Sequence, residues 1–572
     1  MGSLGRLFEF IPKYWLRGLL ALFSLLLGTA VSLTIPYIIK RVIDGPMAVG
    51  NLAEINRYVL IIVIVALVRG IAALVQTYCT ESLAQSVVYD VRNRLYDHLQ
   101  HLSSSYYDKV QTGDLMSRLT SDVETLRMVL GWGLVNFIAN IVLLISILGM
   151  LFSLDWGLAL VASGVFPFAF ITVNRFSKKS RPAYRLLQQQ MARLSSFLQE
   201  NISGIRVVKA FGQERAEVAR FSKHNDENFA RNMGSSKIFA FFFPLINLIS
   251  GLGVAIVLGV GGSKVAIGQM SIGTLVAFNT YLAMLAGPIR MFGWVLNMIN
   301  RASASCERIF EVLDEKVEIL DQPGARELTK CRGEVEFVSV SFGYTPDTLV
   351  LADVSFKAAS GQLIAVVGPT GSGKSSLVNL IPRFYEVSSG GVKVDGLDVR
   401  EYGLQSLRRN VGVVMQDTFL FSAGIGENIS YGLPEASKER VKGAASEAAI
   451  AGFIETLPAQ YAQVIGERGM GLSGGQKQRL ALARALVLKP AILILDDTTS
   501  NVDTETEHAI LGSMEKLRGK STVFVIAQRF SLVKEADLIL VLEDGRIVER
   551  GTHTELVQQK GLYHQMFEMQ LE

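Results

Sequence analysis

The chain has 572 residues, enough for roughly three or four domains of ordinary size. Apolar residues make up 49% of it and charged residues only 19%, which excludes an ordinary soluble protein and predicts a membrane protein. The net charge of +4 is small for this length and gives no indication of a nucleic-acid partner. The three cysteines, Cys79, Cys306 and Cys331, are far apart and odd in number, so we expect neither a disulfide framework nor a metal cluster.

The part of the chain before residue 305 contains six stretches that are long and apolar enough to cross a membrane as helices. They cover residues 15–39, 58–78, 129–154, 156–176, 238–261 and 272–299. In the first stretch the apolar run from Leu19 to Ile39 follows Lys13 and Arg17, but it is too long for the core of a signal peptide, so we interpret it as a retained membrane helix.

The segments 79–128 and 177–237 are long, charged and rich in arginine and lysine. Because such residues concentrate on the cytoplasmic side, we expect these segments and the N-terminus in the cytoplasm, with the chain a multi-pass protein of the cytoplasmic membrane. Helical periodicity continues through both, which predicts helices that extend out of the membrane. Each contains a polar segment, 106–115 and 203–212. These segments are either turns at the tips of hairpins or short helices that lie across the surface of a second, cytoplasmic domain.

From Gly333 the composition changes to that of an α/β domain, with buried strands predicted at 363–367, 411–414, 492–495, 523–526 and 538–542. The predicted organisation is a transmembrane domain at 1–305, a linker at 306–332 that begins within a helix, and an α/β domain at 333–572. The fold class is therefore an all-α six-helix membrane domain fused to an α/β domain.

The segment from Gly368 to Ser375 reads GPTGSGKS, between a predicted strand and a predicted helix over 377–384. Strand, glycine-rich turn and helix form the context of a phosphate-binding loop. Its glycines allow backbone N–H groups to surround a phosphate chain, while Lys374 reaches the outer phosphates and Ser375 holds Mg²⁺. The apolar strand that ends in Asp496 predicts a second carboxylate on the magnesium side.

The residues Leu472-Ser473-Gly474-Gly475-Gln476 precede a predicted helix over 477–488. A serine–glycine sequence before a helix is by itself only a helix cap. Its place about twenty residues before the Asp496 strand makes it a more specific indication of an anion-binding site. With these motifs the chain resembles a half-transporter of the ATP-binding cassette exporter family, over essentially its whole length. The resemblance identifies Gln416 as the glutamine-loop residue, 472–476 as the signature, and the segments around 112–115 and 204–213 as coupling helices.

The resemblance implies that two cassettes meet head to tail, with each ATP between the phosphate loop of one and the signature of the other. It assigns the nucleotide to Tyr344, Gly368, Thr370, Gly371, Ser372, Gly373, Lys374, Ser375, Ser376, Ser473, Gly474, Gly475, Gln476 and Asp503. It assigns Mg²⁺ to Ser375, Gln416 and Asp496. Tyr344 stands where the family stacks a ring on adenine, although an aromatic residue near a strand end is more often packing.

The chain departs from the family at two catalytic positions. Asp497 stands where the family has the glutamate that polarises the attacking water, and Gln528 replaces the switch histidine. Aspartate is one methylene shorter, and a displacement of roughly 1 Å can cost about 10²-fold in rate. Glutamine can form hydrogen bonds but cannot carry the proton charge of histidine. The intact signature beside an impaired site predicts a heterodimer, whose partner half-transporter carries the glutamate and histidine. The alternatives are a homodimer with slow turnover and deliberate mutation to trap ATP.

The predicted function is ATP-driven export of amphipathic or lipophilic compounds, whether small molecules, lipids or peptides. Polar residues in spans usually face the bundle interior, whereas aromatic ones more often pack or face lipid. Candidates for the substrate path are Asn136, Asn140, Asn247, Asn279, Phe241, Phe242, Phe243, Arg290 and Trp294. A soluble ATPase is excluded by the spans, an importer is disfavoured by the fusion, and an ATP-gated channel or regulator would share every motif.

Overall fold

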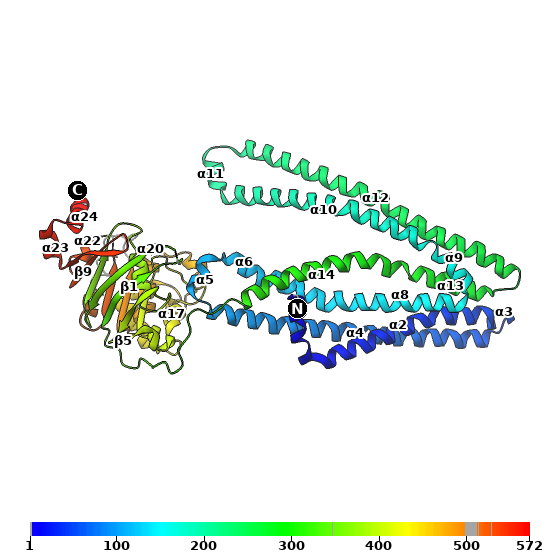
Figure 1. The fold of residues 1–572 in the computed structure, drawn as a ribbon, viewed down its shortest axis with the longest axis horizontal. Coiled ribbons are helices and arrows are strands. Elements are labelled where there is room, and N and C mark those ends of the chain that lie inside the picture. The colour runs from blue at the N-terminus through cyan, green and yellow to red at the C-terminus, as the bar shows by residue number, and fades with distance from the viewer. Residues whose placement is uncertain (1–2, 346, 498–511, 513, 528, 572) are drawn as a thin grey trace. The chain divides into compact units, whose positions relative to one another are not determined.

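The computed structural model describes residues 3–345, 347–497, 512, 514–527 and 529–571 (Figure 1). Contacts divide the chain into two compact units. The helical unit contains Met1–Gln100 and Gly113–Asp314, and the mixed α/β unit contains His101–Thr112 and Glu315–Glu572. A short piece from the first long charged segment therefore belongs to the α/β unit.

The helical unit is built from long helices joined by short turns. Its helices are α1 (Ser3–Leu7), α2 (Trp15–Asp44), α3 (Pro46–Val49), α4 (Leu52–His101), α6 (Thr112–Ser117), α7 (Val123–Met128), α8 (Leu134–Leu154), α9 (Trp156–Ser163), α10 (Phe166–Ser203), α11 (Ile205–Ala210), α12 (Glu214–Ala266), α13 (Ile272–Met284) and α14 (Ala286–Leu313). Two π-helical segments, η3 (Arg118–Asp122) and η4 (Val129–Gly133), flank α7. As predicted, α4, α10 and α12 run far beyond the predicted spans.

Among the described residues, four helical stretches are long and apolar enough to cross a membrane. They are Pro12–Val49, Leu52–His101, Thr112–Leu154 and Glu214–Ala266, and they contain four of the six predicted spans. The other two spans are helical but broken, between α9 and α10 and between α13 and α14.

Both breaks have the same cause in the sequence. Helix α9 ends at Ser163, four residues before Pro167, and α13 ends at Met284, four residues before Pro288. Proline has no N–H to donate to the carbonyl four residues earlier, which favours a break there. Neither hydropathy nor proline alone reveals these breaks, since α2, α10 and α12 continue through Pro36, Pro182 and Pro244.

Two contacts show how closely the helices of this unit pack. A Cβ atom added to Gly273 at the start of α13 would lie 2.4 Å from the Lys40 carbonyl oxygen of α2, so this approach requires glycine. Asp122, buried in η3, accepts hydrogen bonds from the Ser305 hydroxyl at 2.8 Å and the Arg308 Nε at 2.8 Å, both on α14. Helix α14 continues to Leu313, past the predicted domain boundary at 305.

The α/β unit contains two sheets. Their strands are β1 (Val335–Phe342), β2 (Leu351–Ala358), β3 (Leu363–Val367), β4 (Ser389–Val394), β5 (Leu397–Asp398), β6 (Val411–Val414), β7 (Ile492–Asp496), β8 (Thr522–Ile526), β9 (Leu538–Glu543) and β10 (Arg546–Gly551). One sheet is antiparallel in the order β2-β1-β4-β5. The other has the order β10-β9-β3-β8-β7-β6 and is parallel except for β10. The five predicted buried strands are confirmed as β3, β6, β7, β8 and β9.

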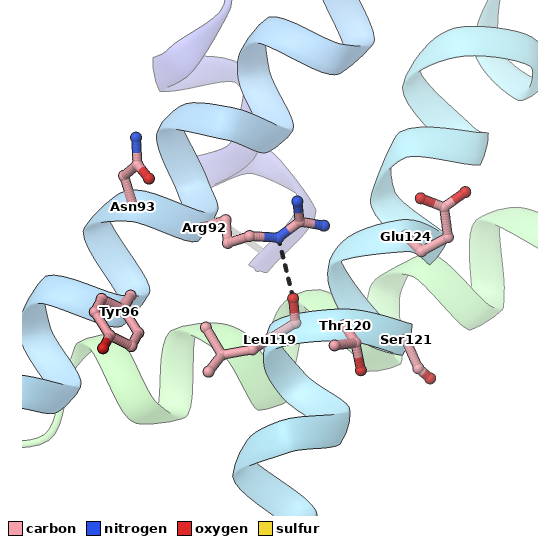
Figure 2. A pocket seen from close by; sticks show the side chains of 7 residues that line it. All are labelled: Arg92, Asn93, Tyr96, Leu119, Thr120, Ser121 and Glu124. Atoms are coloured by element: carbon pink, nitrogen blue, oxygen red, sulfur yellow. Dashed lines mark hydrogen bonds between the residues drawn. The ribbon is translucent and has the colours of Figure 1, made fainter. Parts of the chain in front are cut away.

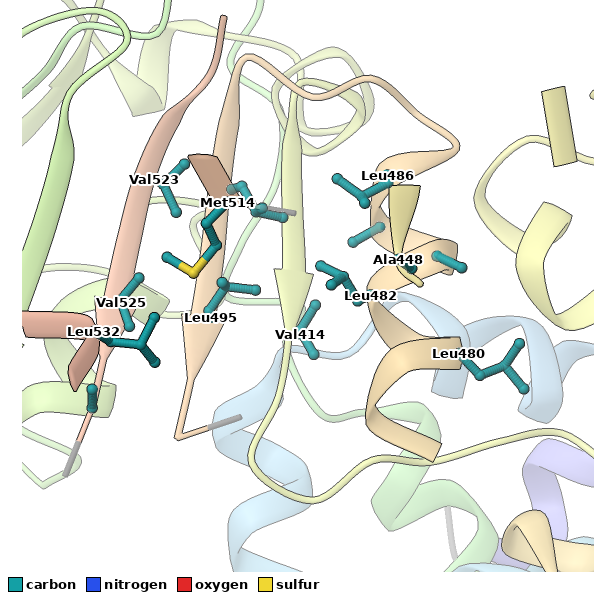
Figure 3. Close-up of a cluster of buried hydrophobic side chains, with 14 of the residues drawn as sticks. Val414, Ala448, Leu480, Leu482, Leu486, Leu495, Met514, Val523, Val525 and Leu532 are labelled. Carbon is teal, nitrogen blue, oxygen red and sulfur yellow. The ribbon is translucent and has the colours of Figure 1, made fainter. Parts of the chain in front are cut away.

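The α/β unit also contains short helices. They are α5 (Ser104–Lys109), α15 (Lys374–Asn379), α16 (Leu404–Arg409), α17 (Ile425–Ile429), α18 (Lys438–Glu447), α19 (Ala451–Thr456), α20 (Gly474–Leu486), α22 (Phe530–Val533), α23 (His553–Gln559) and α24 (Leu562–Leu571). Figure 3 shows the core between this sheet and its helices, where Leu482 and Leu486 of α20 lie near Val414 of β6.

Strand β3 is buried on both faces, which is why it reads as a continuous apolar run. Ala365 and Val367 belong to the core that includes α20, whereas Ile364 and Val366 belong to the core shared with the antiparallel sheet. The carboxyl end of this rigid strand leads directly into the glycine-rich loop.

Candidate functional site: a nucleotide cavity

The loop at 368–373 leaves β3 and enters α15 through backbone conformations that favour glycine. Gly368, Gly371 and Gly373 have φ values of +149°, +86° and +97°. A Cβ at Gly368 would also lie 2.1 Å from the Leu542 carbonyl oxygen of β9, so no other residue fits there without a shift. The predicted helix over 377–384 is wrong in its bounds, since α15 begins at Lys374 and ends at Asn379.

Several of the residues predicted to hold the nucleotide and Mg²⁺ line one cavity of about 340 Å³. It is lined by Tyr344, Val350, Thr370, Gly371, Gly373, Lys374, Ser375, Ser376, Gln416, Asp496, Asp497 and Ile526. Sequence reasoning missed Val350 and Ile526, two apolar residues at the ends of strands. Gly368 and Ser372 belong to the loop but not to this lining.

Lys374 closes the loop on itself. Its Nζ donates to the carbonyl oxygens of Gly368 at 2.9 Å and Pro369 at 2.7 Å. Burial lowers the pKa of Lys374, and the charges of Asp496 and Asp497 oppose that shift. A cation held near two carboxylates in a part-buried cavity can bind an anionic phosphate chain once a second cation balances the carboxylates.

Ser375 and Asp496 form the set that would hold such a cation. The Ser375 hydroxyl donates to Asp496 Oδ1 at 3.1 Å, from the first turn of α15 to the end of β7. Burial raises the pKa of Asp496, and the neighbouring Asp497 charge raises it further. A buried carboxylate beside a hydroxyl is the kind of oxygen set that Mg²⁺ accepts together with phosphate oxygens, so the residues present fit this ion.

Asp497 lies beside this pair and has a backbone conformation that residues other than glycine rarely adopt. Its φ is 48°, in the left-handed region, and the residue is buried. Gln416 Nε2 donates to Asp497 Oδ2 at 3.1 Å. The glutamine-loop residue and the residue at the position of the catalytic base are therefore in direct contact. Gln528 and Asp503 lie outside the described residues.

Tyr344 stands at the edge of the cavity with its ring 42% exposed. Its hydroxyl lies 2.9 Å from the Ser376 hydroxyl, and its ring meets that of Tyr385 edge to face at 5.3 Å between centroids. Tyr385 in turn donates from its hydroxyl to Asp108 Oδ2 of α5 at 2.9 Å. Sequence reasoning missed Tyr385, although an aromatic residue soon after the phosphate-loop helix was a possible signal.

The residues at 473–476 form the start of α20 and do not line the cavity. Ser473 caps the helix by accepting from the Gln476 N–H at 3.3 Å, and Gln476 Oε1 accepts from the Ser473 N–H at 2.9 Å. Ser473 and Gly474 are exposed, while Gly475 is buried. The tip of this helix therefore presents its hydroxyl and first N–H groups at the surface of the unit.

The candidates for the substrate path differ in exposure and in hydrogen bonding. Asn136 and Asn140 donate to backbone carbonyls four residues earlier on their own helix, at 2.6 Å and 2.7 Å. Phe242 is buried, whereas Phe241, Phe243 and Asn247 are exposed. Asn279 has a buried Oδ1 without a hydrogen-bond partner in the described part of the chain. Arg290 and Trp294 lie in α14, but their side chains are not among those that the structure describes.

A second cavity, of about 840 Å³, lies within the helical unit. It lies between α4, which supplies Arg92, Asn93 and Tyr96, and the segment from Leu119 to Glu124 (Figure 2). Arg92 Nε donates across it to the Leu119 carbonyl oxygen at 3.2 Å. It contains no predicted nucleotide ligand, so it is separate from the site described above.

A phosphate-loop cavity in a chain with membrane-spanning helices defines an ATPase coupled to a membrane process. Residues 19–289 match the family model of the ABC transporter transmembrane region, and residues 351–500 match that of the ABC transporter ATPase domain. The chain belongs to the ABC transporter family and is an ATPase-coupled transporter of the exporter architecture.

Similar proteins cover nearly the whole chain. An uncharacterized ABC transporter ATP-binding protein of Bacillus subtilis (strain 168), YknU, is 42% identical over 96% of this chain and 94% of that protein. An ATP-dependent lipid A-core flippase of Desulfotalea psychrophila is 35% identical over 99% of both chains. The structure of a bacterial Atm1-family ABC exporter with ATP bound is 30% identical, with a TM-score of 0.79 over 97% of this chain and 98% of that one.

Proposed function

We propose that the chain is one half of a dimeric exporter that moves amphipathic or lipophilic compounds out across the cytoplasmic membrane. The observation that carries this proposal is the cavity that brings Lys374, Ser375 and Asp496 together in a chain that also has membrane-spanning helices. The N-terminus and the ATPase unit lie in the cytoplasm, where ATP is available.

In this proposal the nucleotide occupies the 340 Å³ cavity, with its phosphates on the 368–375 loop and its adenine against Tyr344. Ser375 and Asp496, with Gln416, would hold Mg²⁺, which would supply positive charge to balance the phosphates. The surface tip of α20, with Ser473 and Gly474, completes the ATP site of the second chain.

We further propose that the second chain is not identical to this one. Asp497 has a carboxylate that is about 1 Å short of a glutamate's reach, and Gln416 already engages it at 3.1 Å. Gln528 cannot supply the charge of a protonated histidine. The groups for ATP binding are intact while those for hydrolysis are altered. This chain therefore contributes the phosphate loop of a slow, ATP-retaining site. It also contributes an intact signature to the fast site, which contains the partner's phosphate loop.

The cycle follows from these unequal sites. ATP closes the two cassettes, the coupling helices move, and the membrane helices open outward. Hydrolysis at the competent site returns the pair to its starting state. ATP can shift this equilibrium only by its differential affinity for the closed state, so retention at the slow site keeps the cassettes partly in contact between cycles.

The cargo class is proposed from composition and from one relative. The spans are broadly apolar and aromatic, which suits a lipophilic or amphipathic compound, and a relative is a flippase of a lipid. A homodimer that exports lipid or peptide with slow turnover is the second candidate, because this chain alone could supply both halves.

The test compares ATPase rates of the purified chain alone, of the chain with a similar half-transporter that carries glutamate and histidine, and of the pair after Asp497→Glu with Gln528→His. We expect slow turnover alone, faster turnover in the pair, and a further change in rate or coupling on restoration. Brisk turnover and transport by the chain alone would contradict the heterodimer. Vectorial transport in vesicles separates a pump from an ATP-gated channel.

A further inference from the structure

The exposed face of α10 carries five cations that nothing in the ATPase cycle uses. They are Arg175, Lys178, Lys179, Arg181 and Arg185, all exposed and all within eleven residues of one helix. We call them the α10 basic patch. At about 100° per residue, they occupy an arc of about 160°, on the side of α10 away from Phe176, Ser180 and Ala183, which are half-buried.

The patch lacks a counter-charge among the ion pairs of the described residues. Within the described part of the chain, none of the five forms an ion pair, whereas Arg127 in the same unit pairs with Glu124 at 2.7 Å. The sequence contains no aspartate or glutamate from 166 to 199 on α10, nor from 228 to 266 on α12, the helix that runs antiparallel beside it (Figure 1). Within these ranges, therefore, the two helices leave the patch available to an anionic molecule.

The place of the patch along the helix indicates what that molecule is. The apolar start of α10 ends at Phe176, where the first cations appear, and the apolar part of α12 begins nearby at Ile238. Phe176 meets Phe239 edge to face at 5.1 Å and Phe242 at 5.7 Å, and Lys179 Nζ lies 5.9 Å from the Phe242 ring centre. Aromatic rings beside lysine and arginine, where an apolar helix ends, mark the level of lipid headgroups.

We propose that the α10 basic patch binds the phosphate headgroup of an anionic phospholipid of the cytoplasmic leaflet. The guanidinium and ammonium groups bind the phosphate oxygens, while the exposed rings of Phe241 and Phe243 lie among the acyl chains on the neighbouring helix. Five cations without a carboxylate give this site a preference for anionic over zwitterionic lipid.

The test uses the full-length protein in phosphatidylcholine nanodiscs that contain spin-labelled phosphatidylglycerol or spin-labelled phosphatidylcholine. The measured quantity is the relative association constant for phosphatidylglycerol, from the immobilised fraction of the label. Each basic residue at a membrane surface raises the association constant for anionic lipid by about fivefold. We expect Lys178→Gln with Lys179→Gln to lower the preference by roughly tenfold or more, and Lys178→Arg with Lys179→Arg to keep it.

The matched control removes the same charge from the opposite end of the hairpin, with Arg215→Gln and Lys223→Gln, both exposed on α12. This control is expected to keep the lipid preference. An equal loss in both double variants overturns the proposal, as does an unchanged preference in the patch variant. Displacement of the label by glycerol 3-phosphate would mean that the patch binds free phosphate. Dissociation of the dimer in the patch variant, with lipid preference intact, would mean that it binds protein.

Discussion

The glycines of the phosphate loop do not have equivalent roles. Both Gly368 and Gly371 have positive φ values, so an alanine is strained at either position. Only Gly368 also faces a close neighbour, because its added Cβ would lie 2.1 Å from the Leu542 carbonyl oxygen, whereas nothing lies within 4 Å at Gly371. The same substitution at the two positions therefore separates backbone strain from steric overlap.

We expect Gly371→Ala to cost about 1–2 kcal/mol of stability, from strain alone. Gly368→Ala causes the same strain and also forces β3 to move relative to β9, so it should cost about 3 kcal/mol or more of stability in total. Thermal unfolding of the purified protein gives the comparison, with ATP binding as a second readout. Equal losses for the two variants would contradict the role of the Leu542 contact.

Short helix α5 is held on the α/β unit by side chains from distant parts of the sequence. Glu318 accepts from the Ser103 hydroxyl at 3.0 Å and also from the Ser105 hydroxyl. At the other end, Tyr385 donates to Asp108, 277 residues away along the chain. Since Tyr385 also touches the ring of Tyr344, α5 is two side chains away from the nucleotide cavity.

We expect Tyr385→Phe to leave ATP affinity nearly unchanged, because Tyr344 and the loop stay in place, and to weaken the stimulation of ATPase activity by transported cargo. Asp108→Ala should have the same effect, and the double variant should be no worse than either single one. Tyr402→Phe is the control, because its hydroxyl bond at 3.1 Å goes to the Val394 carbonyl oxygen. Additive losses would show that the two residues act separately.

The anchor at Glu318 predicts a pH dependence. Hydrogen bonds from Ser105 and Ser103 lower the pKa of Glu318 from its ordinary value of 4.5, against a smaller opposing effect of burial. A lowered pKa means that the stabilisation is complete above the ordinary value and is lost as the pH falls through the folded value. The protection of the α5 amides against hydrogen exchange, relative to the intrinsic exchange rate at each pH, should therefore fall below about pH 4.5. In Glu318→Gln this acid-induced step should be absent, and its persistence would rule out this anchor.

The sequence predicted the elements that have one strong local signal. The strands β3 and β7 are continuous apolar runs, and the loop between β3 and α15 has fixed glycine spacing. By contrast, β10 alternates between exposed and half-buried residues at the edge of its sheet, so its apolar signal is weak. The Tyr385–Asp108 contact could not be predicted at all, because nothing local in either segment specifies the other.

At the scale of the whole molecule, the chain keeps its phosphate loop and its predicted signature apart, although the proposed ATP site needs both. The cavity with Lys374 and the exposed tip of α20 with Ser473 are different surfaces of the same unit, since Ser473 does not line the cavity. In a head-to-tail dimer, each surface therefore serves a different ATP. If the two ATP sites have unequal rates, defects at the two surfaces must have unequal consequences.

We therefore expect an asymmetry in the assembled pair. Lys374→Ala damages only the slow site and should leave most of the ATPase rate. Ser473→Arg inserts a bulky cation at the partner's fast site and should reduce the rate by about 10²-fold or more, as misplacement at a reacting centre does. Because Ser473 also caps α20, Ser473→Ala is the control, with an expected loss of about 1 kcal/mol of helix stability and a much smaller loss of rate. A homodimer gives a different result, since every site then contains both residues and both variants are equally inactive. Steady-state ATPase rates of the three variants thus distinguish a dimer of unequal sites from one of equal sites.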